Sequence, residues 1–167
     1  MTLYAETSAV LRWLFQEEHG EQVRVALSRA AKVVTSRLTA IEVWRATHRA
    51  ERQRRLSAAE AADVRAVFSQ AGAAWAALEL TDDIAHRAEE RFPVEPVRTL
   101  DAIHLASALV LRQSFPDLVV LTADERVRAN ALQLGFVAGL SIDDGSVHES
   151  APVIPRRTGR ATAARRR

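Results

Sequence analysis

Short apolar runs alternate with amphipathic helical patterns along most of this chain, and that alternation limits the folds open to it. Residues 118–122 form a continuous apolar run of strand length, whereas residues 20–31 repeat apolar side chains at the i, i+3, i+4, i+7 spacing of one helix face. Strands and helices that alternate in this way build βαβ units around a parallel sheet. We therefore expect an α/β protein whose helices cover a central, mostly parallel sheet of four to five strands.

Local signals predict where the elements begin and end. Two motifs fit capping boxes that begin helices, Thr39-x-x-Glu42 and Ser57-x-x-Glu60, and Gly135 fits the position just after a helix end. The expected strands are residues 3–6, 32–36, 75–80, 118–122 and 136–140. The expected helices are residues 8–15, 20–31, 39–54, 57–71, 82–92, 100–113 and 124–134.

Composition indicates one globular domain followed by a basic tail. Of the 167 residues 48% are apolar, which is enough for a core, and we expect the domain to occupy residues 1–145. Residues 151–167 contain six Arg and no acid, which leaves 17 basic and 21 acidic residues in 1–150, a net charge of −4. We expect residues 146–167 to be a disordered, solvated tail, with binding of RNA or an acidic partner as the alternative.

Several classes of protein are excluded by what the sequence lacks. The absence of Cys excludes disulfides and thiolate metal sites. No apolar run reaches the roughly 18 residues of a membrane span, and no signal peptide precedes the first expected strand. We therefore expect a cytoplasmic protein without a membrane partner. No Gly-rich phosphate loop, G-x-S-x-G motif or Cys nucleophile is present, which disfavours nucleotide-driven and acyl-transfer chemistry.

Four acidic residues draw attention because each lies in or beside an apolar segment, where an unpaired charge is costly. Glu6 and Asp124 follow expected buried strands, whereas Glu42 and Asp101 fall in the first turns of expected helices. The carboxyl ends of parallel strands form the edge at which open α/β sheets bind their ligands. We predict that these four acids are the catalytic residues of one site.

Carboxylates that share a crevice favour a bound cation. At about 4 Å and an effective dielectric constant near 20, two like charges repel by about 4 kcal/mol, so the group either holds protons or binds a metal. Oxygen-only ligands suit Mg²⁺ or Mn²⁺, which activate water and polarise phosphoryl oxygens. The predicted metal ligands are Glu6, Asp101 and Asp124, and the predicted supporting side chains are Thr7, Ser8 and Thr122. This set predicts hydrolysis of phosphodiesters.

Each acid also has a structural explanation, which for Glu6 is its place between a buried strand and a helix. Glu42 would complete a capping box, and Asp124 would cap the helix that follows it. An anion at Asp101, in the first turn of its helix, would be favoured by the helix dipole by roughly 0.3–1 kcal/mol. No single acid establishes the site, and the prediction depends on their convergence.

Three motifs resemble a known family. They are residues 4–11 (Tyr-Ala-Glu-Thr-Ser-Ala-Val-Leu), 98–106 (Arg-Thr-Leu-Asp-Ala-Ile-His-Leu-Ala) and 121–124 (Leu-Thr-Ala-Asp). Over residues 2–140 the chain resembles a PIN domain, and more narrowly a VapC-type toxin of a bacterial type II toxin–antitoxin pair. The resemblance implies an α/β/α sandwich, a Mg²⁺- or Mn²⁺-dependent endoribonuclease, a homodimer and a small neutralising antitoxin. It also implies that Glu6, Glu42, Asp101 and Asp124 form the acidic set, supported by Thr122.

One position departs from the family pattern, which usually has Asp where this chain has Glu6. The extra methylene moves the carboxylate by up to roughly 1.5 Å, and Mg²⁺ requires near-octahedral geometry. With Glu at position 6 we expect one of three consequences: Glu6 contacts the metal through a water, the site prefers Mn²⁺, or cleavage is slow. The alternative function is an interaction module of the same fold that binds RNA or a protein without cutting. A nuclease that acts on DNA is a third possibility.

The remaining polar and aromatic residues have weaker signals. Arg45, Arg49 and Arg52 share one side of the expected helix with Glu42. They predict either contacts to RNA phosphates or an Arg45–Glu42 pair with the other two solvated. We expect His104 to be a core residue with satisfied hydrogen bonds. Trp13, Trp44 and Trp75 are expected in the core or at a dimer interface.

Overall fold

A computed structural model of the chain describes residues 1–140. The elements run in the order β1 (Thr2–Ala5), α1 (Thr7–Leu14), α2 (Gly20–Arg29), β2 (Lys32–Ser36), α3 (Arg37–Arg52), α4 (Ala58–Gly72), β3 (Ala76–Leu78), α5 (Asp82–Glu89), α6 (Thr99–Ser114), β4 (Leu118–Leu121), α7 (Glu125–Gln133) and β5 (Val137–Gly139). Every boundary lies within three residues of the sequence expectation. The expected tail, residues 146–167, lies outside the described residues. No helix in residues 1–140 is long and apolar enough to cross a bilayer.

The five strands form one parallel sheet in the order β3-β2-β1-β4-β5. Strand β1 lies at the centre, where Tyr4 is in register with Val34 of β2 and Val120 of β4. Because all strands run the same way, their carboxyl ends meet at one edge. This edge carries the residues that follow β1, β2 and β4. The expected class, an α/β fold with a parallel sheet of up to five strands, is confirmed.

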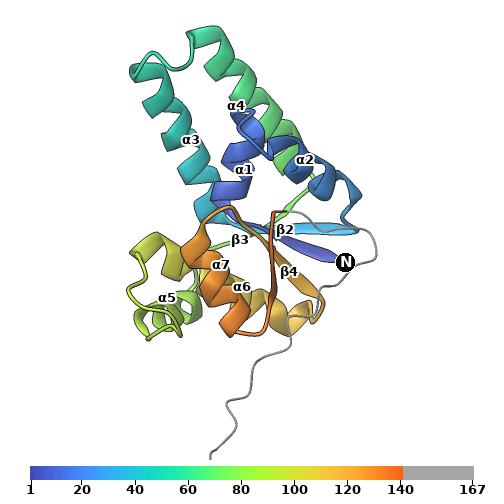
Figure 1. The fold of residues 1–167 in the computed structure, drawn as a ribbon, viewed down its shortest axis with the longest axis vertical. Coiled ribbons are helices and arrows are strands. Elements are labelled where there is room, and N and C mark those ends of the chain that lie inside the picture. The colour runs from blue at the N-terminus through green and yellow to red at the C-terminus, as the bar shows by residue number, and fades with distance from the viewer. Residues whose placement is uncertain (141–167) are drawn as a thin grey trace, which may run out of the picture.

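Alternate residues of the strands serve two separate cores. Leu3 and Ala5 of β1 pack with α1, α2, α3 and α4 on one face of the sheet, whereas Tyr4 packs with α6 and α7 on the other. Figure 1 shows α1–α4 on one side of the sheet and α5–α7 on the opposite side, with α3 and α4 extending away as a helical arm. The three layers are those of an α/β/α sandwich.

Helix α3 begins earlier than expected, and the predicted capping box at its start is wrong. Ser36, the last residue of β2, is the N-cap, and its side chain accepts a hydrogen bond from the backbone N–H of Leu38 at 3.2 Å. Thr39 therefore lies inside the helix, where its hydroxyl contacts Thr35 and Thr7 instead of capping. The other predicted capping box, Ser57 with Glu60, is present at the start of α4.

Two glycines are required by geometry. A Cβ on Gly20 would lie 2.4 Å from the carbonyl oxygen of Arg12, so α2 begins in direct contact with the end of α1. Gly135 follows α7 with φ +83°, which confirms its predicted place after the helix end. Gly20 thus lies against the end of α1 and Gly135 directly after α7, the two helices whose first turns lie at the carboxyl edge of the sheet.

Candidate active site

Glu6 lies at the junction between β1 and α1 and is only 5% exposed. It is the N-cap of α1, and its Oε1 accepts a hydrogen bond from the backbone N–H of Ser8 at 3.0 Å. Its other oxygen, Oε2, accepts hydrogen bonds from the hydroxyls of Ser8 and, at 2.7 Å, Thr122. The longer side chain of Glu6 is therefore held in one orientation by donors from the first turn of α1 and from the segment that follows β4.

Ser8 connects Glu6 to the segment that follows β4. Its Oγ donates to Glu6 and accepts from the backbone N–H groups of Ala123 at 2.8 Å and Asp124 at 2.9 Å. Thr122, which is 1% exposed, also accepts from the N–H of Asp124 at 3.1 Å. Through these bonds, the loop carrying Asp124 is tied to the start of α1.

Glu42 reaches the same edge from the second turn of α3. Its Oε2 accepts a 2.6 Å hydrogen bond from Thr7 Oγ1 and lies 2.7 Å from Nε2 of His104 on α6. Burial raises the pKa of Glu42, but the hydrogen bonds from His104 and Thr7 outweigh it, and the net pKa is lowered. Glu42 is therefore an ionised carboxylate. Its contacts to Thr7 and His104 replace the anticipated pairing with Arg45.

Asp101 and Asp124 lie at the starts of α6 and α7. Asp124 Oδ1 caps α7 by accepting from the backbone N–H groups of Arg126 at 2.8 Å and Val127 at 3.1 Å. Asp101 Oδ2 is buried and has no hydrogen-bond partner among the described residues, although Arg126 Nη1 lies 3.8 Å away. Burial and the charges of Asp124 and Glu6 raise the pKa of Asp101. Holding Asp101 ionised in this place therefore costs free energy.

The carboxylates lie along one edge without forming a closed metal cage. Within residues 1–140, no three His, Asp or Glu side chains already form a group that could hold a metal ion. Protein donors occupy both oxygens of Glu6 and one oxygen of Asp124. The buried, unpartnered Oδ2 of Asp101 is nevertheless an atom that a cation would satisfy. An all-oxygen donor set of this kind fits Mg²⁺ or Mn²⁺.

Comparison with known proteins shows the family to which the chain belongs. The family model described as PIN domain matches residues 3–132. The chain belongs to the PIN domain family. Two relatives from Mycobacterium tuberculosis, named Ribonuclease VapC45 and Ribonuclease VapC49, are each 30% identical to it over 133 residues, which is 80% of this chain and 91% of the relative. The resemblance to VapC-type proteins is thereby confirmed.

A solved structure supports the fold of this PIN domain. The crystal structure of PAE2754 from Pyrobaculum aerophilum matches with a TM-score of 0.57 and covers 84% of each chain. At 18% sequence identity, this likeness shows the shared fold alone. It agrees with the five-stranded parallel sheet and its two helical layers.

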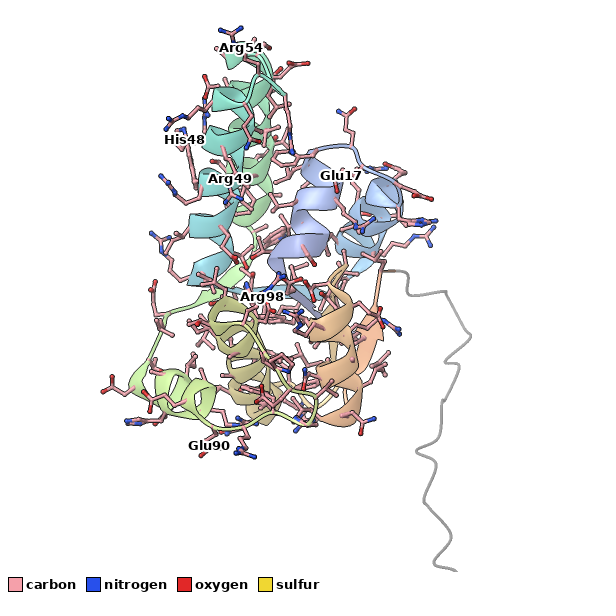
Figure 2. The ribbon with its side chains drawn as sticks, turned by 60° about the vertical axis from the view of Figure 1, so that its left-hand side comes forward. Glu17, His48, Arg49, Arg54, Glu90 and Arg98 are labelled. Atoms are coloured by element: carbon pink, nitrogen blue, oxygen red, sulfur yellow. The ribbon has the colours of Figure 1, made fainter. Side chains whose placement is uncertain are left out.

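A groove of about 360 Å³ lies between α1, α3 and the start of α7 of the PIN domain, and of the four candidate acids Asp124 lines it. Its lining includes Ser8 and Asp124 and also three cations, Arg12, Arg49 and Arg55. Figure 2 shows Arg49 on α3, with Glu17 on the loop beyond α1 and Arg98 near the centre of the molecule. Of the three arginines predicted to contact RNA, only Arg49 lines this groove.

The other two predicted contacts, Arg45 and Arg52, are exposed on α3 and form no ion pair within residues 1–140. Sequence reasoning missed Arg12 and Arg55 because they come from other segments, whose approach to α3 depends on the packing of α1 against the arm. It also gave no role to His104. The expectation that His104 is a buried, satisfied residue is confirmed, since it is 2% exposed.

Proposed function

We propose that this PIN domain is a Mg²⁺- or Mn²⁺-dependent endoribonuclease and the toxin of a toxin–antitoxin pair. The observation that carries the proposal is the buried Oδ2 of Asp101, which lacks a hydrogen-bond partner beside two further carboxylates, Asp124 and Glu6. The names of the two M. tuberculosis relatives support ribonuclease activity as the reaction class.

Asp101, Asp124 and Glu6 would hold the ion. When bound, Mg²⁺ or Mn²⁺ supplies Lewis-acid assistance to the attack of water on a phosphodiester. Ser8 and Thr122 fix the orientation of Glu6, so its carboxylate needs little rearrangement when substrate arrives.

Glu42 has a different task, because it is ionised and only partly exposed, at 23% of its side chain. Its Oε2 is used by Thr7 and His104, whereas its Oε1 has no hydrogen bond to any described residue. Oε1 is therefore available to accept a hydrogen bond from the attacking water or from a ribose hydroxyl. Hydrolysis breaks one P–O bond, adds the water oxygen to phosphorus and gives a proton to the leaving oxygen, so no protein nucleophile is needed.

The groove supplies a path for the substrate backbone. Its lining carries three cations, Arg12, Arg49 and Arg55, against the acids Glu17 and Asp124. Several cations in one groove favour a polyanion over a small molecule. We propose that an RNA strand follows this groove to the carboxylates.

The partners of the protein follow from the same family context. We propose a homodimer and a small antitoxin that neutralises the nuclease, as the resemblance to VapC-type proteins implies. A cytoplasmic site of action is part of this proposal, because the RNA substrate is there. A gene for a small DNA-binding protein immediately upstream would support the pairing, and copurification of the two proteins would test it.

Calorimetric titration with Mn²⁺ tests the metal part without knowledge of the RNA. Wild type, Asp101→Asn and the control Asp63→Asn, an exposed position on α4, are compared after treatment with EDTA and dialysis. We expect saturable binding to wild type and to Asp63→Asn, and loss of that binding in Asp101→Asn. Absence of binding to wild type, or unchanged binding to Asp101→Asn, would contradict the assignment.

A further inference from the structure

A buried hydrogen-bonded chain crosses the sheet edge behind the proposed site. It begins at Tyr4 on β1, which is fully buried, and passes through His104 on α6 to Glu42 on α3. The Tyr4 hydroxyl lies 2.8 Å from Nδ1 of His104, and Nε2 of His104 lies 2.7 Å from Glu42 Oε2. Three elements that are distant in sequence therefore meet at one imidazole ring.

The positions of the protons in this chain follow from its acceptors. Thr7 Oγ1 donates to Glu42 Oε2 at 2.6 Å, so that oxygen already uses one lone pair. A carboxylate oxygen offers only lone pairs, and an unprotonated Nε2 at 2.7 Å would place two acceptors face to face. Nε2 of His104 must therefore carry a hydrogen and donate it to Glu42.

The other ring nitrogen faces a donor. Burial, together with the charge of Glu6, raises the pKa of Tyr4 well above its usual range, so the phenol keeps its proton. Its O–H can be donated to Nδ1 only if Nδ1 is unprotonated. Hydrogen on Nε2 and a free lone pair on Nδ1 therefore satisfy both contacts of the ring, to Glu42 and to Tyr4.

We propose that His104 is a positioning residue, held by Tyr4 as the Nε2–H tautomer, that orients the Glu42 carboxylate toward the nuclease site. The hydrogen bond to Oε2 restrains the side chain and leaves Oε1 for water or substrate. Its effect on cleavage rests on the proposed ribonuclease function, but the tautomer and the orientation of Glu42 do not. An outer residue of this kind typically changes activity by about 10- to 100-fold when it is lost.

Two amide variants distinguish a hydrogen-bond donor at the place of Nε2 from one at the place of Nδ1. In His104→Gln the amide nitrogen can reach the place of Nε2 and donate to Glu42, whereas in His104→Asn the shorter side chain places its amide near Nδ1. We expect His104→Asn to lower kcat for RNA cleavage by about 10- to 100-fold with little change in KM. His104→Gln should recover most of that loss. Equal activity of the two folded variants would overturn the positioning role.

The tautomer is tested directly by NMR of the wild-type protein, labelled with ¹⁵N-histidine, at pH 7.5. This test does not depend on whether the protein cleaves RNA. Long-range ¹H–¹⁵N correlations report which ring nitrogen carries hydrogen, and the spectrum of His104→Gln identifies the signal of His104. We expect a fixed Nε2–H tautomer for His104, in contrast to the exposed His48 on α3, the internal control. A fixed Nδ1–H tautomer would overturn the proposal. Absence of RNA cleavage by wild type would instead contradict the proposed function and leave the NMR result standing.

Discussion

Replacement of Ser8 by Ala should destabilise the protein measurably, because its hydroxyl connects the start of α1 to the segment that follows β4. Ser8 Oγ accepts from the backbone N–H groups of Ala123 and Asp124. Asp124 N–H keeps a second acceptor, Thr122 Oγ1 at 3.1 Å, but Ala123 N–H loses its acceptor. An unsatisfied, partly buried donor costs about 1–3 kcal/mol, and the better helix propensity of Ala recovers about 0.5 kcal/mol.

The expected loss is therefore about 1.5 kcal/mol, and for a chain of this size each kcal/mol lowers Tm by about 2–4 °C. We expect Ser8→Ala to unfold about 5 °C below wild type in a thermal melt followed by circular dichroism. Ser28→Ala is the matched control, since Ser28 is exposed and its hydroxyl bonds only the carbonyl of Val25. It should remain within about 2 °C of wild type. If Ser8→Ala were as stable as Ser28→Ala, the reasoning about this connection would be refuted.

Three further predictions concern charge. Burial and neighbouring acids raise the pKa of Asp101 above its unfolded value near 3.8, so its ionisation destabilises the folded state at higher pH. In EDTA, Asp101→Asn should therefore melt above wild type at pH 7, with the gap closing as the pH falls toward 4; a gap independent of pH would contradict this. For Glu42 the pH dependence of stability has the opposite sign. Its pKa is lowered in the folded protein, so its ionised form stabilises the fold at pH values above its unfolded pKa near 4.5. Glu42→Gln should melt below wild type at pH 7, and the two curves should converge as the pH falls below 4.5; parallel curves would argue against it. In the groove, Arg49→Gln should weaken RNA binding in EDTA and reduce the salt slope by about one, as measured by fluorescence anisotropy. Arg45→Gln, outside the groove, should have a smaller effect, and the reverse order would exclude this path for RNA.

Sequence patterns predicted the fold well because periodicity and apolar runs are local signals. The apolar run 118–122 and the strand 32–36 appear in the structure with almost the same limits, and the order of strands and helices produced the three layers. The predicted start of α3 was wrong because two residues, Ser36 and Thr39, could each cap the helix. Ser36 is already extended at the end of β2, so the helix begins there and Thr39 is left to contact neighbouring threonines.

The site was predictable only as a set of acids at one edge. That Thr7 holds Glu42 and Thr122 holds Glu6 depends on contacts between residues more than 30 positions apart. The part played by His104 was hidden for the same reason. In sequence His104 is one polar residue in an apolar helix, and only the packing of α6 against β1 and α3 brings it to Tyr4 and Glu42.

The central claim, metal-dependent cleavage of RNA through Asp101, is tested most directly by mapping new RNA ends. Purified wild type and Asp101→Asn are incubated with total bacterial RNA in Mn²⁺ or in EDTA, and the 5′ ends are sequenced. The account predicts discrete new ends with wild type in Mn²⁺, and none in EDTA or with Asp101→Asn. No new ends with wild type, or the same ends with Asp101→Asn, would contradict it.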